Sequence, residues 1–212
     1  MDRLIFTAMA SLKQLNNMKL KHANALANAS TVGFKQTFEF ATTTSKVAGA
    51  GFGSRYVPMN RSNDELVIDQ GPLIATGRKL DIYMTGSSLM GVQSPDGQTA
   101  FTRRGDLTVD QAGLLSTANG HVVLGEGGAP ITAPVGVELA ITADGTVTAT
   151  DPAQPDAPPT IVGNLLLRDA TGVRMVRRVD GLYEPITAKG QGGDFQSGPN
   201  PPRVQSGSLE GS

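Results

Sequence analysis

The sequence predicts a mainly β protein with one N-terminal α-helix, that is, a single all-β domain of sandwich or barrel type plus a helix that can form a coiled coil. Three observations indicate this fold class. Apolar residues recur at three- and four-residue steps up to about residue 30, which is helical spacing. Short strand-like runs follow from about residue 55. Turn-forming residues are frequent, with 26 Gly and 13 Pro among 212 residues.

The N-terminal helix is expected within residues 1–33. Its apolar positions alternate three and four residues apart, which is heptad spacing and keeps one seam on one side of a helix. The seam consists of Ile5, Ala8, Leu12, Leu15, Leu26 and Ala29, with Lys19 and His22 at the two remaining positions. Those two polar residues either extend toward solvent or form a polar layer that sets the register. Gly33 is expected to close the helix in a left-handed conformation.

The seam needs a partner, because everything after about residue 50 has the pattern of strands and turns. We therefore expect other chains to cover it, which favours assembly over catalysis. Residues 34–70 are expected to be a connector, and their Thr, Ser, Gly and Ala content favours a flexible loop over an ordered element.

Residues 71–190 are expected to form the all-β domain. Pro95-Asp96-Gly97 and Asp144-Gly145 predict tight turns between strands, and the proline-rich stretch 151–159 predicts an exposed excursion. The strand candidates are residues 66–68, 80–84, 89–92, 99–102, 114–115, 121–124, 137–141, 146–148, 161–167 and 182–184. Residues 191–212 are expected to be an extended return segment.

The composition argues against most kinds of chemistry. With 18 Lys+Arg against 19 Asp+Glu, the charge balance gives no reason to expect nucleic-acid binding. Because Trp is absent and aromatic residues are only 5%, no aromatic surface is expected on which bases or sugars could stack. The chain has no Cys, which excludes disulfides and thiol nucleophiles. His22 and His121 have no metal-ligand spacing to other residues. We expect no catalytic site, metal, cofactor or small-molecule substrate.

Two shorter motifs have ordinary interpretations. Arg103-Arg104 is expected at a strand edge or turn, as an interface or solvated charge. Gly125-Glu126-Gly127-Gly128 is expected to be a turn, since neither a helix nor a Lys follows it as a phosphate cradle requires.

No membrane insertion is expected, because no stretch approaches the roughly 18 apolar residues of a membrane span. A cleaved secretory signal is not expected either. The apolar run near the N-terminus is too short, and Lys13, Lys19 and Lys21 follow it. The lack of Cys suits a chain that crosses a membrane unfolded.

The segment Ala23-Asn24-Ala25-Leu26-Ala27-Asn28-Ala29-Ser30-Thr31-Val32-Gly33-Phe34-Lys35 resembles the N-terminal signature of the flagellar axial proteins, which are rod, hook and hook-cap-junction subunits. In the β domain, Leu80-Asp81-Ile82, Phe101-Thr102-Arg103 and Gly113-Leu114-Leu115 follow the order and spacing of the same family. One position and one segment depart from its pattern. Ala25 stands where Asn is usual, and Gly86-Ser87-Ser88-Leu89-Met90 replaces Gly-Asp-Gly-Phe-Phe.

Within the family, Met1-Asp2-Arg3-Leu4-Ile5, the short connector and Gly181-Leu182-Tyr183 resemble the proximal-rod subunits. The resemblance implies a structural subunit of the bacterial flagellar basal-body rod, in the periplasm. It implies the flagellar type III export apparatus and other proximal and distal rod subunits as partners. The alternatives are a distal rod or hook subunit of the same family, or a β-rich surface binding module.

Family members continue past the motif Ser206-Gly207-Ser208-Leu209-Glu210-Gly211-Ser212 into a C-terminal heptad helix that pairs with the N-terminal one. Either the sequence is a piece of a longer chain or the protein lacks that helix. The expected assembly interface is divided by role. Ile5, Leu12, Leu15 and Leu26 supply helix packing, Asn24 and Asn28 bond to neighbouring helices, and Gly33 and Phe34 set and anchor the exit from the helix.

Overall fold

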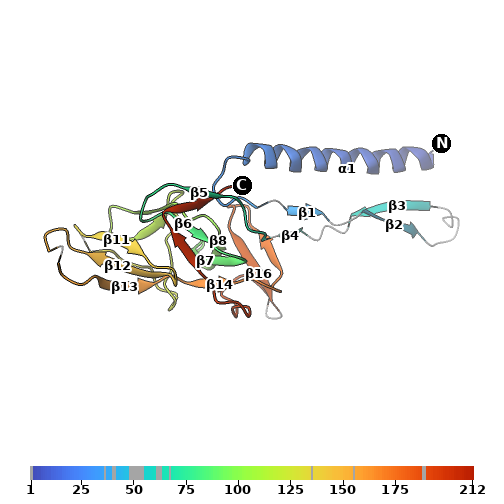
Figure 1. Ribbon diagram of the computed structural model, residues 1–212. Helices are drawn as coiled ribbons and strands as arrows, with labels where there is room; N and C mark the ends of the chain where they lie inside the picture. The colour runs from blue at the N-terminus through green and yellow to red at the C-terminus, as the bar shows by residue number, and fades with distance from the viewer. Residues whose placement is uncertain are drawn as a thin grey trace.

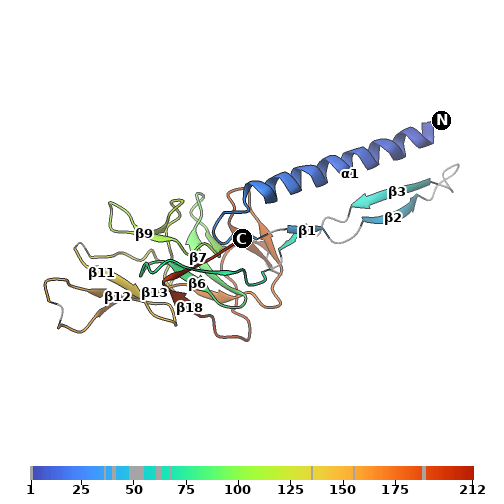
Figure 2. The same ribbon diagram turned by 45° about the horizontal axis from the view of Figure 1, so that its top comes forward.

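A single long helix stands off one side of a body made of short strands (Figure 1). This computed structural model describes residues 2–35, 37–39, 42–47, 55–60, 64–66, 68–134, 136–154, 156–187 and 190–212. The C-terminus lies at the foot of the helix in both ribbon views (Figure 1, Figure 2). The chain is therefore mainly β with one N-terminal helix, as the sequence predicts.

Helix α1 (Asp2–Ala27) ends six residues before Gly33, so the expectation that Gly33 closes it is wrong. The side-chain amide of Asn28 donates to the carbonyl of Asn24 at 2.9 Å, and tight turns follow, with the Thr31 amide on the Asn28 carbonyl at 3.0 Å. An Asn side chain that bonds to nearby backbone competes with helix continuation, which is why the helix stops there. Gly33 does have a positive φ of 66°, but it serves the segment after the helix.

The connector is ordered in the described residues, which corrects the expected flexible loop. β1 (Thr37–Glu39) pairs with β4 (Asp64–Leu66), and β2 (Thr42–Val47) pairs with β3 (Arg55–Asn60), both antiparallel. Strands are favoured here by the β-branched Thr and Val. The β2–β3 ribbon runs beside α1 and projects from the body in the same direction (Figure 2). The glycines 49, 51 and 53, on which the loop expectation relied, lie outside the described residues.

The body consists of small antiparallel sheets. The largest has the order β14-β7-β8-β16-β15, with β17 on β16, and a three-stranded sheet has the order β11-β12-β13. Three two-stranded ladders join β10 to β9, β18 to β6 and β19 to β5. In the described residues no sheet closes into a barrel, so the barrel form of the expectation does not apply.

The bounds of these strands are β5 Leu73–Ala75, β6 Ile82–Met84, β7 Ser88–Gln93, β8 Thr99–Thr102, β9 Leu107–Val109, β10 Leu115–Thr117, β11 Glu138–Ile141, β12 Thr146–Thr150, β13 Thr160–Asn164, β14 Leu167–Asp169, β15 Met175–Arg177, β16 Tyr183–Thr187, β17 Gly190–Gln191, β18 Val204–Ser206 and β19 Ser208–Glu210.

Both turn predictions are confirmed. The Gly97 amide donates to the Ser94 carbonyl at 2.9 Å between β7 and β8, and the Gly145 amide donates to the Thr142 carbonyl at 3.0 Å between β11 and β12. Residues 121–124, expected as a strand, form only isolated bridges. The single strand expected over 161–167 is two strands, β13 and β14, which belong to different sheets.

The tail is part of the β body rather than a segment beyond it. β18 and β19 pair with β6 and β5, so the domain continues past residue 190. Val204 lies in the larger apolar core with Ile82 and Met84. Phe195 lies in a smaller core, where its ring packs edge-on against the ring of Phe101, with 4.8 Å between the two ring centroids. In the described part of the chain, no helix is both long and apolar enough to cross a membrane.

Candidate assembly interface

The apolar side chains of α1 are exposed in the single chain. The exposed fractions are 56% for Ile5, 65% for Leu12, 59% for Leu15 and 79% for Leu26. The β body therefore does not cover the heptad seam. Contiguous exposed apolar surface on a chain of this kind marks an interaction site.

The exposed apolar surface is wider than the predicted seam. Met9, Met18 and Leu20, which the heptad pattern does not include, are also exposed. At about 100° per residue, the apolar side chains together span roughly 200° of the helix circumference. A single coiled-coil seam is much narrower, so this helix can contact more than one neighbour.

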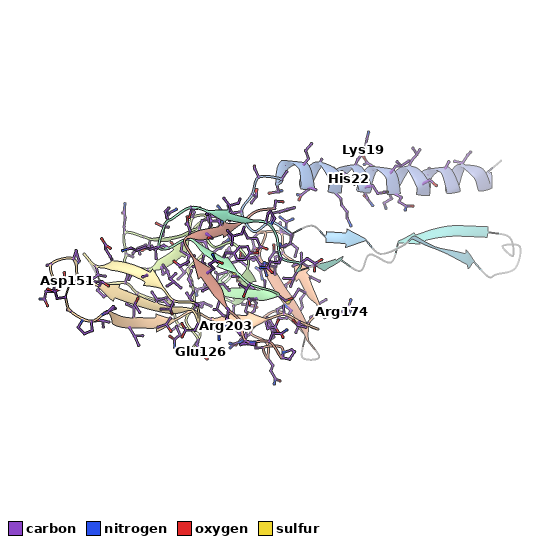
Figure 3. The ribbon with its side chains drawn as sticks, viewed as in Figure 1. Lys19, His22, Glu126, Asp151, Arg174 and Arg203 are labelled. Carbon is purple, nitrogen blue, oxygen red and sulfur yellow. The ribbon has the colours of Figure 1, made fainter. Side chains whose placement is uncertain are left out.

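The two polar residues within the seam, Lys19 and His22, are both exposed on α1 (Figure 3). The two asparagines expected to bond to neighbouring helices already have bonds within the chain. Asn28 bonds to Asn24 and accepts from the Thr31 hydroxyl at 3.2 Å. The Asn24 side-chain oxygen also accepts from Arg177 of β15 at 3.4 Å, so the last helical turn contacts the β body.

The exit from α1 is fixed on the β body by residues 33–35, all of which are buried. At Gly33 a Cβ atom would lie 2.5 Å from the carbonyl oxygen of Arg103, so only Gly fits. The Gly33 amide donates to the Glu210 carbonyl at 2.9 Å, and its own carbonyl accepts from the Tyr183 hydroxyl at 3.2 Å. The guanidinium of Arg177 lies over the Phe34 ring, 4.5 Å from its centroid.

Below this exit lies a buried ion pair between Arg103 and Glu210, both fully buried. Arg103 Nε donates to Glu210 Oε2 at 2.5 Å and Nη2 to Oε1 at 2.9 Å. The other guanidinium hydrogens reach the carbonyls of Gly86, Ser88 and Met84 at 2.7–3.0 Å. The expectation that Arg103 is an interface or solvated charge is therefore wrong. Its neighbour Arg104 is half-buried and pairs with Asp106 at 2.6 Å.

Lys35 completes this cluster from the helix side. Its ammonium donates to Glu210 Oε1 at 2.8 Å and to the Asp69 carbonyl at 2.5 Å. We call Lys35, Arg103 and Glu210 the base cluster. All three residues belong to family motifs in the sequence, but no role was expected for Lys35 or Glu210, and the role expected for Arg103 is wrong. The sequence feature that could have pointed to this cluster is a single charged residue in each of three motifs made otherwise of apolar, small or polar uncharged residues.

Burial also affects the titration of Tyr183, which contacts the same exit. Removal of its hydroxyl from water raises the pKa of Tyr183 to about 12 from an ordinary value of 10. The neutral hydroxyl therefore keeps its bond to the Gly33 carbonyl throughout the physiological range.

Among the described residues, no group of three or more His, Asp or Glu side chains is arranged to hold a metal ion. His121 is half-buried and far along the chain from His22 on α1. The candidate functional features of the described residues are therefore the exposed apolar face of α1 and the buried base cluster at the exit from the helix.

Comparison with known proteins identifies the family. Residues 83–149 match the family model of the flagellar hook protein FlgE/F/G D1 domain. The chain is 38% identical over 215 residues to the flagellar basal-body rod protein FlgF of Salmonella typhimurium and to that of Escherichia coli, which covers 100% of this chain and 83% of each relative. It is 30% identical to the flagellar basal-body rod protein FlgG of Buchnera aphidicola, over 84% of this chain and 72% of that relative. The similarity to FlgF along the entire chain, together with the match of residues 83–149 to the FlgE/F/G D1 domain, means that this chain belongs to the FlgF family and is a structural subunit of the flagellar basal-body rod.

Proposed function

We propose that this subunit assembles into the rod through α1, whose apolar face packs against helices of neighbouring subunits. The observation that carries the proposal is the exposure of Ile5, Leu12, Leu15 and Leu26 in the single chain. Burial of each such side chain would stabilise the assembled state by about 1.5–3 kcal/mol, so four of them supply a substantial driving force.

The width of the apolar face favours a tube of helices over a simple pair. A pair needs only one narrow seam, whereas Met9 and Leu20 lie on one flank of the Leu12–Leu26 stripe and Met18 on the other. In this arrangement α1 lines the inside of the rod and the β body forms its outer layer. A C-terminal heptad helix, as in the family, would be one of the helices that cover the seam.

The role is mechanical and needs no catalytic step, cofactor or small-molecule substrate. The subunit would transmit torque between motor and hook through contacts with other proximal and distal rod subunits. We expect it to reach the periplasmic rod through the flagellar export apparatus, without a cleaved signal peptide. A chain without Cys suits such passage, since it cannot be trapped by disulfides.

A charge placed on the seam tests the proposal. Leu12→Asp and Leu26→Asp should abolish rod assembly and swimming, because each buries a carboxylate among apolar side chains. The matched control is Asn17→Asp, which adds the same charge about 170° away around the helix from the centre of the seam. Asn17 is exposed, so the control should assemble and swim.

The readouts are swimming in soft agar and the amount of subunit in purified basal bodies. Circular dichroism of the purified variants checks that the β body remains folded. Normal swimming by Leu12→Asp cells would contradict the proposal.

A further inference from the structure

The Arg103–Glu210 pair is complete without any further partner. A guanidinium has five N–H donors, and all five of Arg103 are used, two on Glu210 and three on the carbonyls of Gly86, Ser88 and Met84. The carboxylate also accepts from the Gly71 amide at 2.5 Å. One positive and one negative charge already balance in this pair.

Lys35 adds a second positive charge to this balanced pair, in a place where charges are costly to bury. Its side chain is 8% exposed and that of Glu210 is fully buried. A buried cation without its own counter-ion lowers the stability of the fold unless hydrogen bonds and ion pairs offset the cost of its desolvation. An apolar residue of the same length would fill the space without the cost of burying a charge. The ammonium group of Lys35 therefore has a role other than packing.

What Lys35 adds is a link between chain segments. It is the only member of the base cluster on the helix side, and it connects the exit from α1 to β19 near the C-terminus, 175 residues away. It also bonds to the Asp69 carbonyl, just before β5. The polypeptide entering and the polypeptide leaving the β body are thus held against each other at one point.

A small rotation of α1 at this point displaces the far end of the helix by a large distance. A helix of 26 residues is about 39 Å long, so a rotation of about 10° at its base moves the far end by about 7 Å. Among the described residues, side chains also link the helix end and its exit to the β body through the contacts of Arg177 with Asn24 and Phe34 and through the hydrogen bond of the Tyr183 hydroxyl to the Gly33 carbonyl. None of these contacts is an ion pair.

We propose that Lys35 is a positioning residue, which sets the angle between α1 and the β body by pairing with Glu210. The inference rests on the proposed function for its consequence: neighbouring helices meet in register only if each α1 leaves its β body at the same angle. Arg103 and Glu210 hold the β body together, whereas Lys35 orients the helix on it.

The test measures the helix angle separately from folding. Because the chain has no Cys, Asn17→Cys in the middle of α1 and Thr108→Cys in β9, both at exposed positions, accept a pair of spin labels without competition. Their distance distribution is recorded by pulsed electron resonance in the full chain. A label at this position is about 15 Å from the end of α1, so a rotation of about 10° moves it by about 3 Å.

Lys35→Met should broaden this distribution at least twofold while leaving the urea midpoint of the β body within error. Incorporation into basal bodies should fall about tenfold or more, the factor expected for one or two charge-assisted hydrogen bonds. Lys35→Arg keeps the charge and should restore both the narrow distribution and assembly. Lys79→Met, which breaks the exposed ion pair with Glu138, is the matched control and should change nothing.

Two results would overturn the inference. One is an unchanged distance distribution in Lys35→Met. The other is a loss of β-body stability as large as that of Arg103→Met, which would make Lys35 an ordinary structural residue. Failure of the proposed function looks different: the distribution broadens in Lys35→Met as expected, but rods assemble normally both with that variant and with Leu12→Asp.

Discussion

The residues that hold α1 on the β body are mostly charged or polar, and they are buried. Arg103 and Glu210 are both fully buried and have complete hydrogen bonding. Such a pair adds little net stability compared with apolar residues of equal volume, but loss of one partner is costly. Its contribution is therefore geometric: it joins the residue that follows β8 to the last residue of β19 beneath the helix exit.

Tyr183 offers a pH-dependent test of the same exit. Burial raises the pKa of Tyr183 to about 12, above the value of about 10 in an unfolded chain. A group whose pKa is raised by folding stabilises the native state fully below the unfolded pKa. That contribution is lost as the pH rises from about 10 through 12, and two units correspond to roughly 3 kcal/mol.

We therefore predict that Tyr183→Phe changes the pH dependence of the free energy of unfolding, measured in urea. At pH 8 the variant should be less stable by about 1 kcal/mol, because the hydrogen bond to the Gly33 carbonyl is lost. Between pH 10 and 12 the parent should lose stability faster than the variant. A difference between the two proteins that stays constant across this range would contradict the burial of the hydroxyl.

At the scale of elements, α1 differs from the strands in what supports it. Helices of this kind derive most of their stability from packing of an apolar face, and the face of α1 is exposed. Strands β7 and β8, by contrast, contribute Met90, Val92 and Ala100 to the larger core and are almost entirely buried.

This contrast predicts a large difference in amide hydrogen exchange. In the free subunit, amides of residues 5–24 should exchange much faster than those of β7 and β8, because local opening of α1 exposes no buried core. In assembled rods the α1 amides should become slow. Strong protection of α1 in the purified monomer would indicate that the apolar face is already covered there.

The sequence was sufficient for elements that carry a local pattern. The heptad spacing predicts α1, and Pro95-Asp96-Gly97 and Asp144-Gly145 predict the turns that join β7 to β8 and β11 to β12. It was insufficient for β18 and β19, since a Gly-, Pro- and Ser-rich tail has little alternation of its own. Those strands form because β6 and β5 offer edges for pairing, which no local pattern reveals.

The same limit applies to the interface. Periodicity is enough to place Ile5, Leu12, Leu15 and Leu26 on one face of a helix, and the structure shows that this face is exposed. The base cluster could not, because its bonds join residues 107 and 175 positions apart. Arg103 next to Arg104 has the pattern of a surface basic pair, and only the fold separates the buried one from the half-buried one.

The whole molecule has two ends with different properties. One end is α1 with its exposed apolar face and the β2–β3 ribbon beside it, and the other is the β body (Figure 1). Between residues 2 and 27 the helix has four basic residues and one acidic residue, although the whole chain has a net charge of −1. The last described residues lie beside the inner end of α1, where the helix joins the β body (Figure 1, Figure 2).

The central claim is that the α1 face is buried between subunits, and the accessibility of one seam residue tests it most directly. Leu12→Cys introduces a single thiol into a chain that has none. With a maleimide reagent, the thiol should react fully in the purified subunit, where Leu12 is 65% exposed. In basal bodies from swimming cells of the same strain we predict that it is protected. An equally reactive thiol in intact basal bodies would contradict the account.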